Sequence, residues 1–132
     1  MKSFVIVVKD NEISELGYQE LADSYLKYGH YDGIEPYYAI ESYKAEMYAR
    51  GNGLDWNYPW SGQKTDLKTG LIKTAYPTAD KGRRISCFLS HWYLWQKCKK
   101  LDEMICILEH DARFIKKLPS DRTFRNSKYD II

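Results

Sequence analysis

Three residues whose side chains can bind a metal ion, Glu109, His110 and Asp111, directly follow a short apolar run in this chain. The run covers residues 104–108 and includes two β-branched isoleucines, which is typical of a strand buried on both faces. Residues two apart in a strand point to the same side, so we expect Glu109 and Asp111 to converge. Carboxylate oxygens with one imidazole suit Mg²⁺ or Mn²⁺, and an ion at such a strand end could hold a diphosphate. The alternative is an acidic turn in which Asp111 caps whatever follows.

The elements that would position these residues alternate between strands and helices. Ser14 and Ser42 are the expected N-caps of the first two helices. In chain order we expect a strand at 4–8, a helix at 14–27, a strand at 37–40, a helix at 42–49, a helix at 85–100, the strand at 104–108 and the opening of another strand at 129–132. The alternation predicts an α/β fold with a mostly parallel sheet in one domain of residues 1–132.

Residues 50–84 break this alternation with glycines, prolines and aromatic side chains. A long segment without regular structure is often functional, so one interpretation is a loop that folds over a ligand. Trp56 and Trp60 would then stack on a sugar or a base, and Arg84 would clamp a diphosphate with its guanidinium fork. The alternative is an insertion that covers the core, with Arg84 in a solvated loop.

Composition narrows the class of protein. Residues 1–66 hold eleven acidic against six basic residues, and residues 67–132 hold seven against fourteen, although the net charge of the chain is only +2. A basic half can attract phosphates, but nothing else in the sequence favours nucleic acid as a partner. No stretch approaches the roughly 20 apolar residues of a membrane span. We expect a cytoplasmic protein, because no signal peptide is recognisable and the three cysteines have no disulfide spacing.

Two motifs together carry a family resemblance. The first, at 84–91, reads Arg-Ile-Ser-Cys-Phe-Leu-Ser-His, and the second, at 107–112, reads Ile-Leu-Glu-His-Asp-Ala. Both motifs, their spacing and the apolar start at 4–8 resemble glycosyltransferase family 25, which includes lipopolysaccharide-type sugar transferases and collagen galactosyltransferases. The resemblance is close over 84–114 and loose over the rest of the chain.

The resemblance implies a GT-A-like, Rossmann-type sheet that binds a nucleotide-diphosphate sugar, commonly linked to UDP, together with Mn²⁺ or Mg²⁺. The implied reaction transfers the sugar to a hydroxyl of a glycan or a protein. Glu109 and Asp111 would join the ion to the diphosphate, with His110 as a third candidate ligand. The residues implied to lie at the donor are Val8, Lys9, Asp10, Arg84, Ser90 and His91.

The sequence also departs from the family pattern. His110 stands where the family usually has Asp, which lowers the negative charge of the metal site, and Ser86 replaces a usual glycine. The chain ends within about twenty residues of Asp111, where we expect family members to continue, so no residue is identified as the catalytic base. A short or truncated, phage-like relative is one expectation. The alternative function is a non-catalytic relative that binds a partner, and an oligomer is compatible with either.

Two histidines outside the acidic motif have competing interpretations. His91 lies on the flank of an apolar helical face, where a histidine either packs structurally or serves the site that the resemblance implies. His30 lies in a glycine-flanked turn and is expected at the surface.

Overall fold

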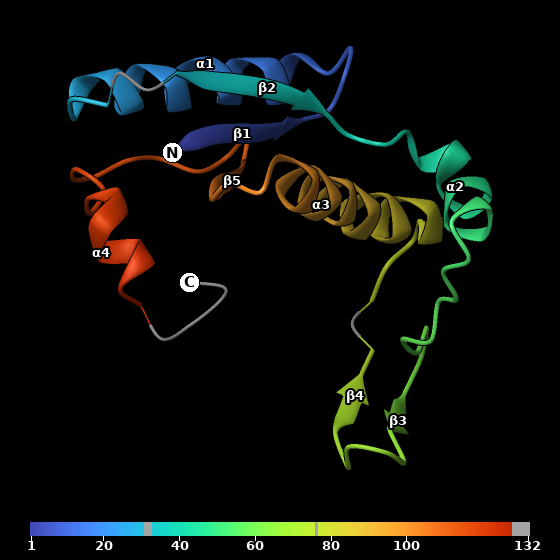
Figure 1. Cartoon of the computed structure of the whole chain (residues 1–132). Helices are drawn as coiled ribbons and strands as arrows, with labels where there is room; N and C mark the ends of the chain where they lie inside the picture. The colour runs from blue at the N-terminus through green and yellow to red at the C-terminus, as the bar shows by residue number, and fades with distance from the viewer. Residues whose placement is uncertain (31–32, 76, 128–132) are drawn as a thin grey trace. The chain divides into compact units, whose positions relative to one another are not determined.

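The computed structural model describes residues 1–30, 33–75 and 77–127 of the chain (Figure 1). Its contacts divide it into two compact units. The first unit comprises residues 1–39 and 93–132, and the second comprises residues 40–92. The strand expected at 129–132 lies outside the described residues.

The first unit is built on a three-stranded parallel sheet. The order is β2-β1-β5, with β1 at Lys2–Val7, β2 at Ile34–Tyr38 and β5 at Ile105–Glu109. β1 is paired on both sides, with Val5 opposite Pro36 in β2 and opposite Leu108 in β5. Parallel strands of this kind need crossover connections, which α1 at Glu12–Lys27 supplies between β1 and β2.

Helices cover both faces of the central strand. Val5 and Val7 pack on one face against Leu21 of α1. On the other face, Phe4 and Ile6 pack against Leu94, which belongs to the C-terminal part of α3 at Lys81–Leu101. Burial on both faces explains why 4–8 reads as an uninterrupted apolar run. The fold class is therefore confirmed as α/β, with a small parallel sheet flanked by helices like part of a Rossmann fold.

The first helix begins earlier than its sequence pattern indicates. Asn11, not Ser14, is the N-cap, because its Oδ1 accepts a hydrogen bond from the Ser14 N–H at 2.9 Å. Ser14 is buried inside the first turn, where its Oγ accepts the N–H of Val8 at 2.8 Å. A serine three residues into a helix can bond to a neighbouring loop as readily as it can cap, and sequence periodicity does not distinguish the two.

The second unit contains a short helix, a hairpin and the start of α3. A 3₁₀ turn at Ser42–Lys44 leads into α2 at Ala45–Gly51. Ser42 caps neither element, since Glu41 is the N-cap of the turn and Lys44 is the N-cap of the helix, both without a side-chain cap bond. The antiparallel pair β3 at Gln63–Thr65 and β4 at Ile72–Thr74 follows. The segment 50–84 is therefore only partly irregular, and α3 begins within it at Lys81.

The strand β5 differs from its expected burial. All its residues before Glu109 are partly exposed, because β5 pairs only with β1 among the described residues. A short helix, α4 at Asp121–Arg125, follows and is capped by Ser120. No helix in the described ranges is both long enough and apolar enough to cross a bilayer.

Candidate functional site

The carboxyl ends of β1 and β5 bring two sets of predicted site residues to one edge of the sheet. Ile6 of β1 pairs with Glu109, the last residue of β5. Because these strand ends are paired, the residues that leave β1, from Val8 to Asp10, lie next to the turn that leaves β5. All three are exposed. This edge is where ligands bind in open parallel sheets.

The acidic motif forms a turn rather than an extension of the strand. The Ala112 N–H donates to the Glu109 carbonyl at 3.0 Å, which closes a turn over 109–112. The strand ends at Glu109, so the alternation of side chains that was expected to place Glu109 and Asp111 on the same side does not extend to Asp111. Both carboxylates are exposed. In the described structure the ligand atoms of these two residues and His110 do not all lie within 4.8 Å of one another. Their role as metal ligands remains a prediction.

His110 lies against helix α1 at a glycine. A Cβ added to Gly17 would meet the His110 carbonyl oxygen at 2.7 Å and the Cδ2 atom of its ring at 3.1 Å. Arg113 stabilises the same contact, because its Nη1 donates to the carbonyls of Gly17 and His110, each at 3.3 Å. Its Nη2 also forms an ion pair with Glu20. The turn after β5 is thus held on α1 by the close approach of the two backbones at Gly17 and by the side chain of Arg113.

The chain beyond this turn continues along α1. The Phe114 N–H donates to the Ser24 Oγ at 3.1 Å, and the Leu118 N–H donates to Nε2 of His30 at 3.1 Å. His30 is buried and stacks on Tyr25, with ring centroids 4.7 Å apart. The expectation of a surface His30 is therefore wrong, because the imidazole lies in the interior and accepts the partly buried N–H of Leu118.

Exposed carboxylates dominate this edge of the sheet. The first turn of α1, which follows β1 at the same edge, adds two further acidic residues to those already described. The exposed acidic residues among 8–15 and 109–113 are Asp10, Glu12, Glu15, Glu109 and Asp111, against two basic residues, Lys9 and Arg113, of which Arg113 is paired with Glu20. An anionic diphosphate would be repelled here unless a cation lay between. The charge of this edge therefore favours cations over anions.

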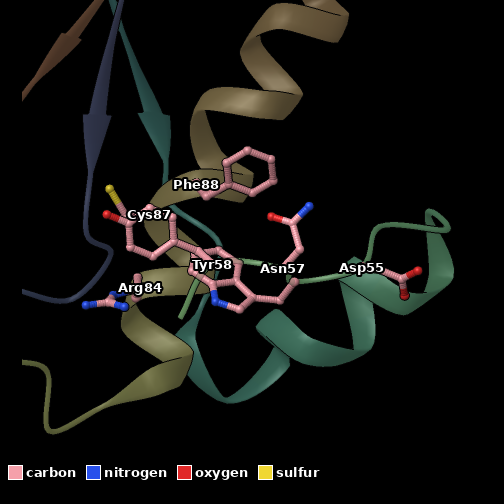
Figure 2. Close-up of a pocket in the computed structure, with 7 residues that line it drawn as sticks. Asp55, Asn57, Tyr58, Arg84, Cys87 and Phe88 are labelled. Carbon is pink, nitrogen blue, oxygen red and sulfur yellow. The ribbon is translucent and has the colours of Figure 1, made fainter. Parts of the chain in front are cut away.

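The second unit contains an aromatic pocket of about 480 Å³ (Figure 2). Trp56 stacks on Trp60, with centroids 5.2 Å apart and planes 14° apart. Tyr58 and Phe88 meet Trp56 edge-on, at interplanar angles of 65° and 81°. Trp60 supports Trp56 from behind and is not part of the lining, which consists of Asp55, Trp56, Asn57, Tyr58, Arg84, Cys87 and Phe88.

Arg84 serves this pocket as a buried support. Its guanidinium lies 5.7 Å from the centroid of the Tyr58 ring and 5.3 Å from that of Trp60, and its Nη1 donates to the Pro59 carbonyl at 3.2 Å. With 7% of its surface exposed, Arg84 holds the loop to α3. The alternative that placed Arg84 in a solvated loop is wrong, and its role as a diphosphate clamp remains a prediction.

Ser90 is fully buried on α3. Its Oγ donates to the Ser86 carbonyl at 2.8 Å and accepts the Ile40 N–H at 3.1 Å. Both hydrogen-bonding functions of the hydroxyl are therefore used within the second unit. His91 follows it and is partly exposed. The assignment of Ser90 and His91 to the donor site remains a prediction.

Comparison with protein families gives one match. Residues 74–130 match the model of glycosyltransferase family 25 (LPS biosynthesis protein). The matched range covers less than half of the 132-residue chain and shows a similarity to that family over these residues. The matched range contains both motifs that carry the resemblance and the acidic turn, whereas β1 and Trp56 precede it. Searches of curated proteins and of solved structures found no match.

Some residues of these sites escape detection by sequence patterns. Gly17 is the exception with a usable signal, because an isolated glycine inside a helical pattern is unfavourable unless something packs against it. Arg113 carries no such signal, since an arginine after an acidic motif is ordinary. The pocket residues Tyr58 and Phe88 lie 30 positions apart, so only the tertiary structure places them together.

Proposed function

We propose that this chain acts as a glycosyltransferase that takes a sugar from a nucleoside-diphosphate donor, with UDP as the carrier, and transfers it to a hydroxyl of a glycan or a protein. The observation that carries the proposal is the family match over 74–130, which contains the acidic turn at the ligand-binding edge of the sheet. The similarity to this family over residues 74–130 supports sugar transfer, and the parallel sheet supports a nucleotide at this edge.

The residues of the edge fit a divalent cation. Glu109 and Asp111 are exposed carboxylates at the end of β5, and hard oxygen ligands suit Mn²⁺ and Mg²⁺. When bound, the ion supplies Lewis-acid stabilisation of the charge that develops on the departing nucleoside diphosphate. The chain itself orients the donor, since Val8 to Asp10 leave β1 beside the acidic turn.

The position of the acidic turn is maintained by helix α1. Arg113 bonds to the Gly17 and His110 carbonyls, so the turn stays in place even though its carboxylates repel one another. We therefore expect removal of one carboxylate to change ligand binding without unfolding the protein.

Calorimetric titration of UDP, with and without Mn²⁺, tests the proposal. We expect UDP to bind only when Mn²⁺ is present, and Asp111→Asn to weaken that binding about tenfold or more. The matched control is Asp23→Asn, which removes an exposed carboxylate farther along α1 and should bind UDP like the unaltered chain.

Two outcomes would contradict the proposal at different levels. Unchanged binding in Asp111→Asn, with circular dichroism confirming the fold, would remove Asp111 from the donor site. Failure of UDP to bind under any condition would reject the donor itself, and the non-catalytic alternative would then take its place.

A further inference from the structure

The pocket of the second unit has walls that suit a flat ligand with apolar faces. Trp56 and Phe88 meet at 81°, and Trp56 and Tyr58 at 65°, so the rings form a corner rather than a flat sheet. A ligand ring in such a corner contacts one aromatic face with its own face and another aromatic ring with its edge. The pocket's volume of about 480 Å³ lies in the range of small-molecule sites.

The polar atoms of the pocket have hydrogen-bonding capacity that the described residues do not use. The indole N–H of Trp56 is buried and has no partner among them. The Oδ1 of Asn57 accepts a hydrogen bond from the Lys73 Nζ at 3.4 Å, and its NH₂ group makes no hydrogen bond within the described ranges. The carboxylate of Asp55 makes none there either. The pocket therefore offers two kinds of donor and one acceptor to a ligand.

The charges around the pocket disfavour a phosphate. Among the lining residues only Asp55 and Arg84 are charged, with opposite signs, and Arg84 is engaged with Pro59 and with aromatic rings. The nearby Lys73 is paired with Asp66 at 3.2 Å. An anionic ligand would be repelled by the exposed carboxylate of Asp55, which belongs to the lining of the pocket.

We propose that this pocket binds a neutral pyranose ring, with Trp56 and Phe88 as stacking surfaces and Asp55 and Asn57 as partners of its hydroxyls. A pyranose combines an apolar face of C–H groups with hydroxyls that both donate and accept, which matches the aromatic corner and the unused polar atoms. The ligand's role as the acceptor glycan rests on the proposed glycosyltransferase function, whereas its binding to the pocket does not.

Alkylation of Cys87 reports whether the pocket is occupied. Cys87 lines the pocket and is exposed, whereas burial raises the pKa of the Cys106 thiol and slows its reaction. Cys98, in the first unit, serves as the internal reference. The probes are methyl α- and β-glycosides of glucose, galactose, mannose and N-acetylglucosamine, and the iodoacetamide labelling of each cysteine is followed by peptide mass spectrometry.

We expect at least one glycoside to slow the labelling of Cys87 and to leave that of Cys98 unchanged. At a concentration of twice the dissociation constant, occupancy slows labelling about threefold, and Trp56→Ala and Asn57→Ala should reduce the affinity about tenfold and severalfold respectively. The matched controls are Trp95→Ala and Gln96→Ala, which alter exposed residues outside the pocket and should keep the affinity.

Three results would overturn the proposal. The first is that no glycoside slows the labelling of Cys87. The second is that a glycoside slows it equally in the unaltered protein and in both Asn57→Ala and Trp56→Ala. The third is that uridine slows it more than any glycoside does. Asn57→Ala keeps the test valid if Trp56→Ala fails to fold, since Asn57 is exposed. The UDP titration is a separate measurement, so a failed pocket leaves the donor proposal standing, and a failed donor leaves the pocket standing.

Discussion

A missing side chain at Gly17 allows α1 to lie against the turn that carries the acidic residues. The distance of 2.7 Å from an added Cβ to the His110 carbonyl oxygen is shorter than real contacts, and the helix fixes the Cβ position while the oxygen belongs to the backbone of the turn. Gly17 therefore positions the turn because it has no side chain to keep the His110 backbone away.

Gly17→Ala is expected to destabilise the protein. Alanine alone would favour the helix by about 1 kcal/mol. Overpacking against the turn costs about 1–3 kcal/mol, so we expect a net loss of about 1 kcal/mol and a lower thermal midpoint. Thermal unfolding followed by circular dichroism measures the change.

Gly51→Ala is the control for this prediction. Gly51 is the last residue of α2, and nothing lies within 4 Å of an added Cβ. Its midpoint should stay constant or rise. A Gly17→Ala protein that is as stable as the Gly51→Ala protein would show that the turn does not press on α1.

Two serines one helical turn apart on α3 explain a departure from the family pattern. Ser86 stands where the family usually has glycine, and its Oγ donates to the Ile40 carbonyl, while Ser90 accepts the Ile40 N–H. Both backbone groups of Ile40 are thus satisfied by side chains at positions i and i+4. The Ser86 hydroxyl therefore has a structural role, because a glycine at this position would have no group to donate to the Ile40 carbonyl.

At the scale of elements, the segment after β5 is an irregular strand of chain held along α1. Phe114 packs with the cluster of Val5, Val7 and Leu21. Its ring lies 5.3 Å from Tyr25 and 5.2 Å from His30, measured between centroids. This packing, more than any regular structure, fixes where the chain goes after the acidic turn.

Phe114→Ala should destabilise the protein by about 2–3 kcal/mol. This is at or below the lower end of the range for a fully buried phenylalanine, because Phe114 is partly exposed. Urea denaturation measures the free energy of unfolding. The neighbouring Ile115 is 79% exposed, so Ile115→Ala should change that free energy by less than about 0.5 kcal/mol. Equal effects of the two substitutions would contradict the packing of Phe114.

At the scale of the whole molecule, the two units differ in how their strands are stabilised. β1 is paired on both sides and buried on both faces, whereas each strand of the β3–β4 hairpin has three residues that are mostly exposed. Local opening is therefore far easier in the hairpin than in β1.

Hydrogen exchange should resolve this difference. Amides at the centre of β1 should exchange only through global unfolding, which requires about 5 kcal/mol or more, so they should exchange at least about a thousandfold more slowly than those of the hairpin. Native-state exchange followed by NMR measures both rates in one sample. Comparable rates in β1 and in the hairpin would contradict the assignment of β1 as the centre of the core.

The sequence by itself determined the α/β class, the chain order of the main elements and the similarity to glycosyltransferase family 25 over residues 74–130. The runs 4–8 and 104–108 identify strands because a short continuous stretch of apolar, β-branched residues is typical of a strand in a parallel sheet. The sequence also identified the acidic motif and the aromatic segment, since both depend on residue type and local spacing. The capping residues were missed because a serine near a helix start can bond in several ways.

Only the tertiary structure decided which residues meet. Hydrogen bonds between distant segments, such as Leu118 to His30, place a histidine in the interior that its local turn assigns to the surface. Likewise, Arg84 becomes a buried support because Trp60, Tyr58 and Pro59 surround it. Contacts of this kind depend on the three-dimensional path of the chain, which residue type and spacing do not encode locally.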